Sequence, residues 1–207
     1  GYSRQHSTIC SAASDAGCKA GVGAKRGVDA REIGEHSDVV VLWGTNAVHT
    51  QVNLMHHVSK ASKRGAKLIV VDPYRNATAK KADLHIMLQP GSDGAVASAL
   101  MHVLLKENLA DRDYLAGYTD FNNELEDHLE TKTPEWASAI SGVSAEEIIE
   151  FARLIGCNPK TYYRFGYGFT RSRNGAFNMH AASCLPAMTG AWKYKGGGGL
   201  YSNSELC

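Results

Sequence analysis

The chain has 207 residues, with 22 Lys or Arg against 21 Asp or Glu, so its formal net charge is +1. With 43% hydrophobic residues it can bury a sizeable core, and the absence of any basic stripe argues against nucleic-acid binding. The longest apolar stretches are strand-sized, far below the ~20 residues that cross a bilayer, so no direct membrane insertion is expected.

The five cysteines, at positions 10, 18, 157, 184 and 207, are scattered and form no CxxC pair. This spacing argues against a disulfide framework and against a zinc or iron–sulfur site ligated within the chain. No signal peptide is visible. The chain opens without Met and stops soon after a glycine run at 196–199, which favours an internal fragment of a longer protein.

The first half of the chain predicts alternating strands and helices. Residues 38–43 form a continuous, largely β-branched run, typical of a strand buried on both faces. Apolar side chains recur at three-to-four spacing over 48–63, which predicts a helix. Short apolar runs at 67–72 and 84–88 predict two more strands, and 95–106 predicts an apolar helix. This alternation indicates βαβ units with a parallel sheet.

The second half begins with helices. Residues 111–157 are helical in character, with Pro134 at a first helical position and a capping box from Ser144 to Glu147. A strand is predicted over 161–168, followed by an apolar helix over 175–190.

Unusual residues follow the ends of the first three predicted strands. In a parallel sheet these ends meet at one edge, where ligands bind. Glycine lets the backbone approach a phosphate, and a carboxylate after the second strand can accept hydrogen bonds from ribose hydroxyls. Asp93 could accept from the ring N–H and amino group of a guanine. The candidate nucleotide-binding residues are Trp43, Gly44, Thr45, Asn46, Asp72, Pro73, Tyr74, Arg75, Asn76, Gly91, Ser92 and Asp93.

Each of these loops by itself reads more simply as a turn, but three at successive strand ends favour a nucleotide site. No G-x-G-x-x-G fingerprint follows the first strand, which weakens the alternative of a nicotinamide-dependent dehydrogenase.

Together with Gly166-Tyr-Gly168, Arg171 and Asn174-Gly175, these loops resemble the molybdopterin oxidoreductases. That family comprises the bis-molybdopterin guanine dinucleotide enzymes related to dimethyl sulfoxide reductase, formate dehydrogenase and periplasmic nitrate reductase. The likeness extends through Met188-Thr-Gly190 to the glycine run.

An α/β fold is therefore expected, with a Rossmann-like parallel sheet flanked by helices and inserted in a second, incomplete α/β domain. Residues 38–157 would form the dinucleotide-binding domain. Residues 1–37, with a metal-ligand loop, and 158–207 would belong to the second domain.

The resemblance also implies roles for individual residues. Residues 43–46 would line the diphosphate of one pterin cofactor, loop 72–76 would hold its ribose and guanosine, and residues 91–93 its guanine. Tyr167 and Arg171 would contact the cofactor from the returning segment. The family's usual Pro after the asparagine is Ala47 here.

Cys10 lies 33 positions before Trp43 and resembles the family's metal ligand, a role that suits a soft thiolate. The alternative is a small buried hydrophobic residue, the usual fate of a free cysteine.

The function that the resemblance implies is two-electron oxidation or reduction of a small substrate at a molybdenum or tungsten bis-molybdopterin guanine dinucleotide. An iron–sulfur cluster would lie in a missing N-terminal part, an electron-transfer subunit is a possible partner, and the compartment would be the cytoplasm or periplasm of a prokaryote. The fragment by itself is expected to be inactive. Ser11 stands where related formate dehydrogenases carry His, which disfavours formate. A catalytically retired relative, acting as a structural or electron-transfer subunit, stays open as an alternative.

Overall fold

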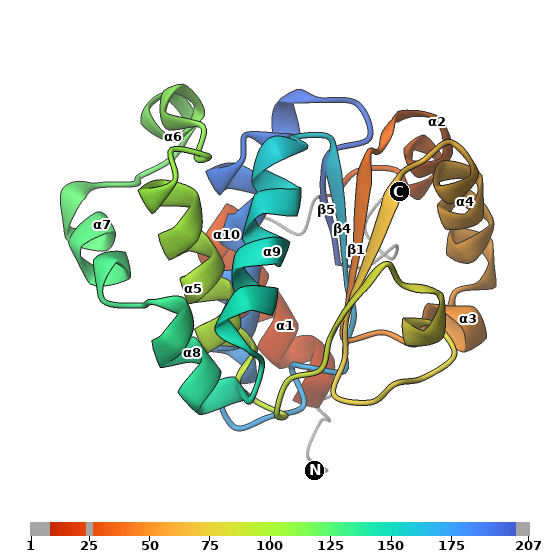
Figure 1. Ribbon diagram of the computed structural model, residues 1–207, viewed down its shortest axis with the longest axis horizontal. Coiled ribbons are helices and arrows are strands. Elements are labelled where there is room, and N and C mark those ends of the chain that lie inside the picture. Colours follow the sequence, from red (N-terminus) through yellow and green to blue (C-terminus); the bar gives the residue numbers. More distant parts are fainter. Residues whose placement is uncertain (1–8, 24–26, 202–207) are drawn as a thin grey trace, which may run out of the picture.

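The computed structural model describes residues 9–23 and 27–201, with the backbone alone for Ile9 and Cys10. Helices surround one central sheet (Figure 1). In chain order the elements are α1 (Ile9–Val22), η1 (Ala30–Glu32), α2 (Ile33–His36), β1 (Val39–Trp43), α3 (Ala47–Thr50), α4 (Val52–Lys63), β2 (Lys67–Val71), η2 (Ala79–Lys81), β3 (Leu84–Ile86), α5 (Asp93–Lys106), α6 (Arg112–Tyr118), α7 (Asn123–Glu130), α8 (Pro134–Ser141), α9 (Ala145–Cys157), β4 (Thr161–Phe165), α10 (Gly175–Met188), η3 (Ala191–Lys193) and β5 (Gly198–Leu200).

The sheet has five parallel strands in the order β3-β2-β1-β4-β5. β1 is central and pairs along its whole length with β2 on one side and β4 on the other, so that Trp43 lies beside Val71 and Phe165. All five residues of β1 are buried, as its continuous apolar run predicts. The predicted α/β fold with a parallel sheet flanked by helices is confirmed.

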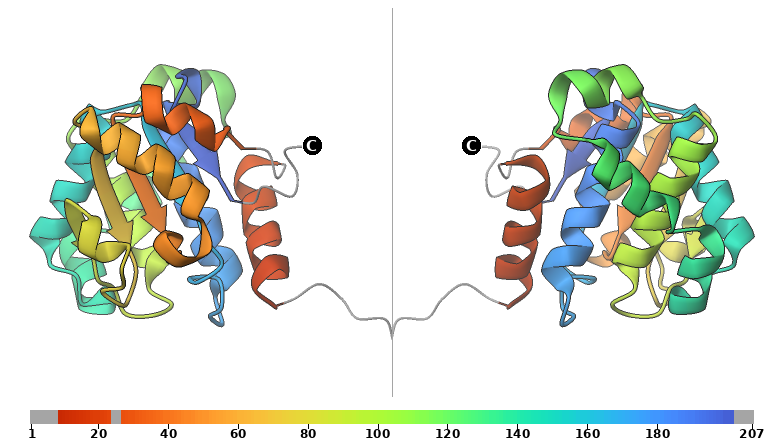
Figure 2. Two further views of the ribbon diagram at one scale, coloured as in Figure 1. Left: turned by 90° about the vertical axis from the view of Figure 1, so that its right-hand side faces the viewer. Right: turned by 90° about the vertical axis from the view of Figure 1, so that its left-hand side faces the viewer.

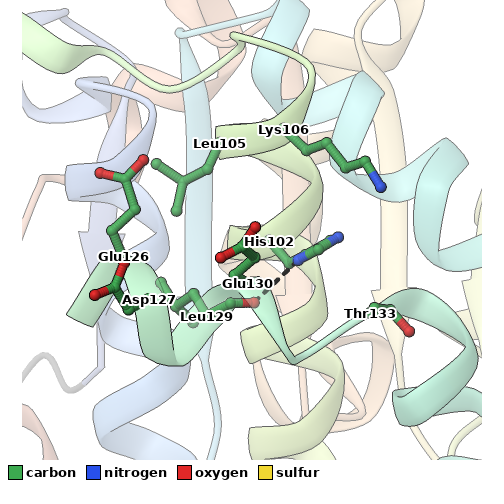
Figure 3. Close-up of a pocket in the computed structure, with 8 residues that line it drawn as sticks. All are labelled: His102, Leu105, Lys106, Glu126, Asp127, Leu129, Glu130 and Thr133. Carbon is green, nitrogen blue, oxygen red and sulfur yellow. Dashed lines mark hydrogen bonds between the residues drawn. The ribbon is translucent and has the colours of Figure 1, made fainter. Parts of the chain in front are cut away.

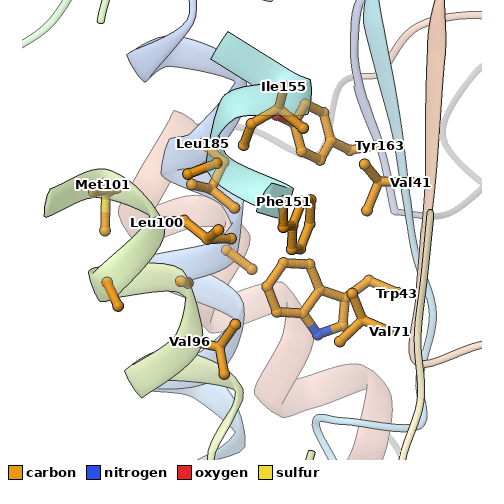
Figure 4. Packing of buried hydrophobic residues seen from close by; sticks show 14 of the residues in the cluster. Val41, Trp43, Val71, Val96, Leu100, Met101, Phe151, Ile155, Tyr163 and Leu185 are labelled. Carbon is orange, nitrogen blue, oxygen red and sulfur yellow. The ribbon is translucent and has the colours of Figure 1, made fainter. Parts of the chain in front are cut away.

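Each face of the sheet carries its own apolar core. Val41 and Trp43 point toward α5, α9 and α10 and meet Leu100 and Phe151 there (Figure 4). On the other face, Leu42 and its neighbours pack against α4 in a second cluster. Burying both faces explains why the strand sequence shows no alternation between apolar and polar residues.

Small residues allow helices α1 and α10 to pack closely. A Cβ on Gly17 would stand 2.3 Å from the carbonyl oxygen of Ala176, and one on Gly21 would stand 2.3 Å from Ser183 Oγ. The two helices run side by side at one flank of the molecule (Figure 2).

Most predicted elements are confirmed with shifted ends. The helix predicted over 48–63 is divided, because Gln51 adopts a non-helical backbone (φ −144°, ψ 56°) between α3 and α4. The capping box of α9 forms as expected: Glu147 N–H donates to Ser144 Oγ, and Ser144 N–H donates to Glu147 Oε2. Within residues 9–23 and 27–201, no helix is long and apolar enough to span a bilayer.

β4 and β5, from the segment expected to return to a second domain, complete the same sheet as β1 to β3. The division into a dinucleotide-binding domain at 38–157 and a second domain from 1–37 and 158–207 stays a prediction.

Candidate functional site

Loops from β1 and β4 meet at the topological switch point of the sheet. The chain leaves β1 toward β2 and β3 and then returns to β4 on the other side. Ligands of open parallel sheets bind outside the carboxyl ends of the strands at this point. The predicted glycine loop after β1 is therefore in the position that a ligand site requires.

Glycines let these two loops pack backbone to backbone. Gly166 N–H donates to the carbonyl of Trp43 at 2.7 Å, and Gly168 N–H donates to that of Gly44 at 2.9 Å. A Cβ on Gly166 would stand only 2.3 Å from the Gly44 oxygen. Gly44 has a φ of +65°, a conformation that residues with a side chain rarely adopt. The close packing of the two loops therefore requires glycine at positions 44, 166 and 168.

Side-chain hydrogen bonds fix the rest of the β1 loop. Thr78 Oγ1–H donates to Asn46 Oδ1 at 2.9 Å, and the same oxygen of Thr78 accepts from Val48 N–H at 3.0 Å. Gln51 Nε2–H donates to Thr45 Oγ1 at 3.2 Å. Thr78 and Gln51 were not among the predicted site residues, because nothing in their local sequence marks them.

The loop after β2 presents exposed side chains on a rigid base. Asn76 Oδ1 accepts from the N–H groups of Thr78 and Ala79, at 2.9 and 3.0 Å, and Asp72 Oδ1 accepts from Tyr74 N–H at 2.9 Å. Burial raises the pKa of Asp72. Three side chains in this loop are exposed to solvent: Pro73, Tyr74 and Arg75.

Asp93 is the most unusual residue of the site. Its side chain begins α5, is only 2% exposed, and accepts a hydrogen bond from the indole Nε1–H of Trp43 at 2.8 Å. Its other oxygen, Oδ2, is buried and has no hydrogen-bond partner in the described part of the chain. Burial raises the pKa of this carboxyl to about 6, although the Trp43 hydrogen bond and the nearby backbone N–H groups of Asp93 and Gly91 oppose the shift.

The loop before Asp93 is held by two asparagines. Asn174 Nδ2–H donates to the carbonyl of Gly91 at 2.9 Å, and Gly94 N–H donates to Asn178 Oδ1 at 3.0 Å. Gly91 has a φ of +89°. The carboxyl ends of β3 and β4 are thereby joined, although the strands are not neighbours. Asn178 was not among the predicted site residues. The signal that could have found it is its place as a polar residue four positions after Asn174 in a largely apolar helix.

The remaining predicted residues lie in different surroundings. The Trp43 indole is fully buried and packs against Phe151 and Phe169, at ring centroid distances of 6.1 and 6.0 Å. Tyr167 is 37% exposed at the carboxyl edge, and Arg171 is also exposed. The structure therefore brings Trp43 to the site as a support for Asp93.

The first turn of α1 carries the backbone of Cys10, whose side chain lies outside the described residues. One turn further on, Ser14 Oγ–H donates to Thr170 Oγ1 in the β4–α10 loop at 2.8 Å. The predicted metal-ligand segment thus runs beside the carboxyl edge of the sheet. Among the described residues, no three His, Cys, Asp or Glu side chains gather in a way that could hold a metal ion.

Two hollows lie in the helical layer on the α5 side. A cavity of ≈ 550 Å³ adjoins the third loop, with Gly91, Ser92, Asn174 and Asn178 in its lining. The other, of ≈ 490 Å³, lies between α5 and α7 (Figure 3). His102 in its wall is hydrogen-bonded through Nδ1 to the carbonyl of Leu129 at 3.0 Å, and the hollow contains none of the predicted site residues.

A parallel sheet with glycine-rich and acidic loops at its carboxyl edge defines the class of α/β dinucleotide-binding folds. Residues 9–204 match the family model described as molybdopterin oxidoreductase, and the chain belongs to that family. The resemblance seen in the sequence is confirmed, and with it the molybdopterin cofactor of the family.

Similar proteins support this assignment. The chain is 39% identical over its whole length to "Probable oxidoreductase YoaE" of Bacillus subtilis, and 38% identical over 75% of its length to "F420-dependent formate dehydrogenase 1 subunit alpha" of Methanococcus maripaludis. It spans 30% and 23% of those proteins. Acetylene hydratase from Pelobacter acetylenicus shares the fold, with a TM-score of 0.80 and 23% identity over 88% of this chain and 25% of that one.

Proposed function

We propose that this chain is part of the catalytic subunit of a molybdenum or tungsten bis-molybdopterin guanine dinucleotide oxidoreductase. The enzyme would oxidise or reduce a small substrate by two electrons. When bound, the cofactor supplies the redox chemistry at its metal, and the described residues bind and orient its nucleotide end.

The residues at the carboxyl edge fit a guanine dinucleotide, and Asp93 carries the proposal. A buried carboxylate oxygen without a partner is costly unless a ligand donates to it. Guanine offers two adjacent donors, the ring N–H and the 2-amino group, which match one carboxylate. The indole of Trp43 donates to Asp93 Oδ1, which can still accept a second hydrogen bond, and Oδ2 has no partner among the described residues, so the carboxylate can accept both donors.

The other loops suit the remaining parts of the nucleotide. Asp72, half-buried after β2, can accept from ribose hydroxyls, and the exposed Arg75 is available to the guanosine. Glycine backbone at Gly44 allows close approach of the diphosphate. Tyr167 and Arg171 would reach the cofactor from the β4 loop. Cys10 would supply the thiolate that ligates the metal.

The iron–sulfur cluster and the surface that meets an electron-transfer partner would lie in other parts of the enzyme. One relative is named as an alpha subunit, which supports a multi-subunit assembly. Its substrate is named as formate, whereas Ser11 after Cys10 favours a different small substrate here.

The test is analysis of the full-length protein purified from a cofactor-producing host. We expect near-stoichiometric molybdenum or tungsten, pterin fluorescence, and two guanine nucleotides released per metal. The Asp93→Ala variant should retain less of the dinucleotide than wild type. A well-folded wild-type protein without metal or pterin would contradict the proposal and favour a catalytically retired subunit.

A further inference from the structure

A further polar cavity lies on the face of the sheet that α4 covers, opposite the two hollows on the α5 side. It lies between α4 and the carboxyl ends of β4 and β5. Its volume is ≈ 670 Å³, within the range of small-molecule sites. The lining includes none of the loop residues proposed for the guanosine. The described residues of the lining include Asp29, Arg31, Gln51, Asn53, His57 and Arg164.

Arg164 gives this cavity its charge. The side chain is only 6% exposed, and its Nη1–H groups donate to the backbone carbonyls of Phe165, Leu200 and Tyr201. These carbonyls satisfy one nitrogen but do not neutralise the cation. Among residues 9–23 and 27–201, no carboxylate pairs with Arg164, and its Nε and Nη2 have no hydrogen-bond partner.

The other ionisable groups of the lining leave that charge uncompensated. Asp29, the only carboxylate among the described residues of the lining, is paired with Arg31, whose Nε–H donates to it at 2.8 Å. Burial lowers the pKa of His57, which favours its neutral form. Among the described lining residues, Arg164 is therefore the charge that no neighbouring group compensates.

Three neutral polar residues share this cavity with Arg164. Thr50, Gln51 and Asn53 line the same cavity at the break between α3 and α4. The Thr50 hydroxyl already donates to the carbonyl of Asn46 at 3.0 Å, so the amide groups of Gln51 and Asn53 are the neutral donors of this lining. A guanidinium edge together with amide donors is typical of sites that bind oxyanions. Gln51 also hydrogen-bonds Thr45, in the loop proposed for the diphosphate, so the cavity is joined to the cofactor edge.

We propose that this cavity binds a phosphate group, with Arg164 as its cationic residue. The group could belong to a small phosphate-bearing molecule in solution or to the diphosphate of the proposed dinucleotide. The second source depends on the proposed function, whereas the first does not.

The experiment measures thermal unfolding of the full-length protein, cofactor-free and cofactor-loaded, across a titration of inorganic phosphate at constant ionic strength. We expect a saturable rise in Tm for the cofactor-free wild type. Arg164→Gln should weaken the phosphate affinity by about tenfold or more, because a charged hydrogen bond is lost. Arg153→Gln, a surface arginine paired with Glu107, is the matched control and should respond as wild type does.

Because Arg164→Gln also removes strand-end hydrogen bonds, a second variant leaves Arg164 intact. Gln51→Glu places a carboxylate in the cavity and should abolish the response to phosphate without unfolding the protein. A response confined to the cofactor-free protein assigns the site to the cofactor's diphosphate, and a response in both forms assigns it to a separate phosphate ligand. No saturable response in the cofactor-free wild type, or a response in both variants equal to that of wild type, would overturn the proposal.

Discussion

The indole Nε1–H of Trp43 donates to Oδ1 of Asp93 at 2.8 Å, joining the end of β1 to the start of α5. Fifty residues separate the two in the sequence, and both side chains are almost fully buried. The hydrogen bond fixes one carboxylate oxygen and leaves the other without a partner among the described residues. Trp43, which is expected to contact the cofactor, therefore also supports Asp93, the residue expected to bind guanine.

The raised pKa of Asp93 predicts a pH-dependent stability. Because its pKa is about 6 in the folded state against 3.8 ordinarily, the folded state holds the proton more tightly. The contribution of this carboxyl to the free energy of unfolding should fall as pH rises from about 4 to about 6 and stay level above 7. The total fall should be about 3 kcal/mol.

The measurement is urea unfolding of cofactor-free wild type and Asp93→Asn between pH 4 and pH 8. The difference between the two proteins isolates the Asp93 titration from other groups. A difference that is constant over this range, or that moves in favour of wild type as pH rises, would show that Asp93 titrates normally.

Trp43→Phe tests the indole as a hydrogen-bond donor. Phenylalanine keeps an aromatic ring against Phe151 and Phe169 but removes the N–H. We expect destabilisation of about 1.5–3 kcal/mol at pH 7.5, where Asp93 is ionised, and less at pH 5, where it is protonated. The control is Trp136→Phe, in a partly exposed tryptophan of α8. Equal losses at both pH values would assign the effect to packing alone.

Gly166→Ala tests the contact between the β1 and β4 loops. The new Cβ would stand 2.3 Å from the Gly44 carbonyl oxygen, so the loops must separate. We expect a loss of about 2 kcal/mol or more in the free energy of unfolding, and weaker retention of cofactor. Gly117→Ala, in the exposed helix α6 with no atom within 4 Å of the added Cβ, should be neutral or stabilising by up to about 1 kcal/mol. Equal stability of the two variants would refute the close contact.

Cys10→Ala tests the proposed metal ligand in the full-length, cofactor-loaded protein. X-ray absorption at the metal edge should report one sulfur ligand fewer, and the bound metal should decrease. The matched control is Cys157→Ala, which removes an exposed, free thiol at the end of α9. Unchanged sulfur coordination in the Cys10→Ala variant would contradict the assignment of Cys10 as a metal ligand.

The sequence predicted the elements whose signals are local. The run Val39–Trp43 is typical of a doubly buried strand, and Ser144 and Glu147 cap α9 through bonds made within four residues. It also predicted that the loops after β1, β2 and β3 share one edge, because parallel strands place their carboxyl ends together.

The helix break at Gln51 could not be predicted, since its neighbours keep a helical apolar spacing on both sides. Nor could the positions of Thr78 and Asn178, whose partners Asn46 and Gly94 lie 32 and 84 residues away. Hydrogen bonds of this range depend on how the loops are arranged in space, which no local pattern records.

By itself, the sequence determined the family, the parallel sheet and the set of loops that gather at its edge. Only the tertiary structure decided that the Trp43 side chain enters the core to hold Asp93, and that Arg164 lies buried with no carboxylate partner in the described part of the chain. The physical reason is that β1 and β4 are buried on both faces. In such strands an apolar run leaves open which side a residue faces, and the helices packed on each layer decide it.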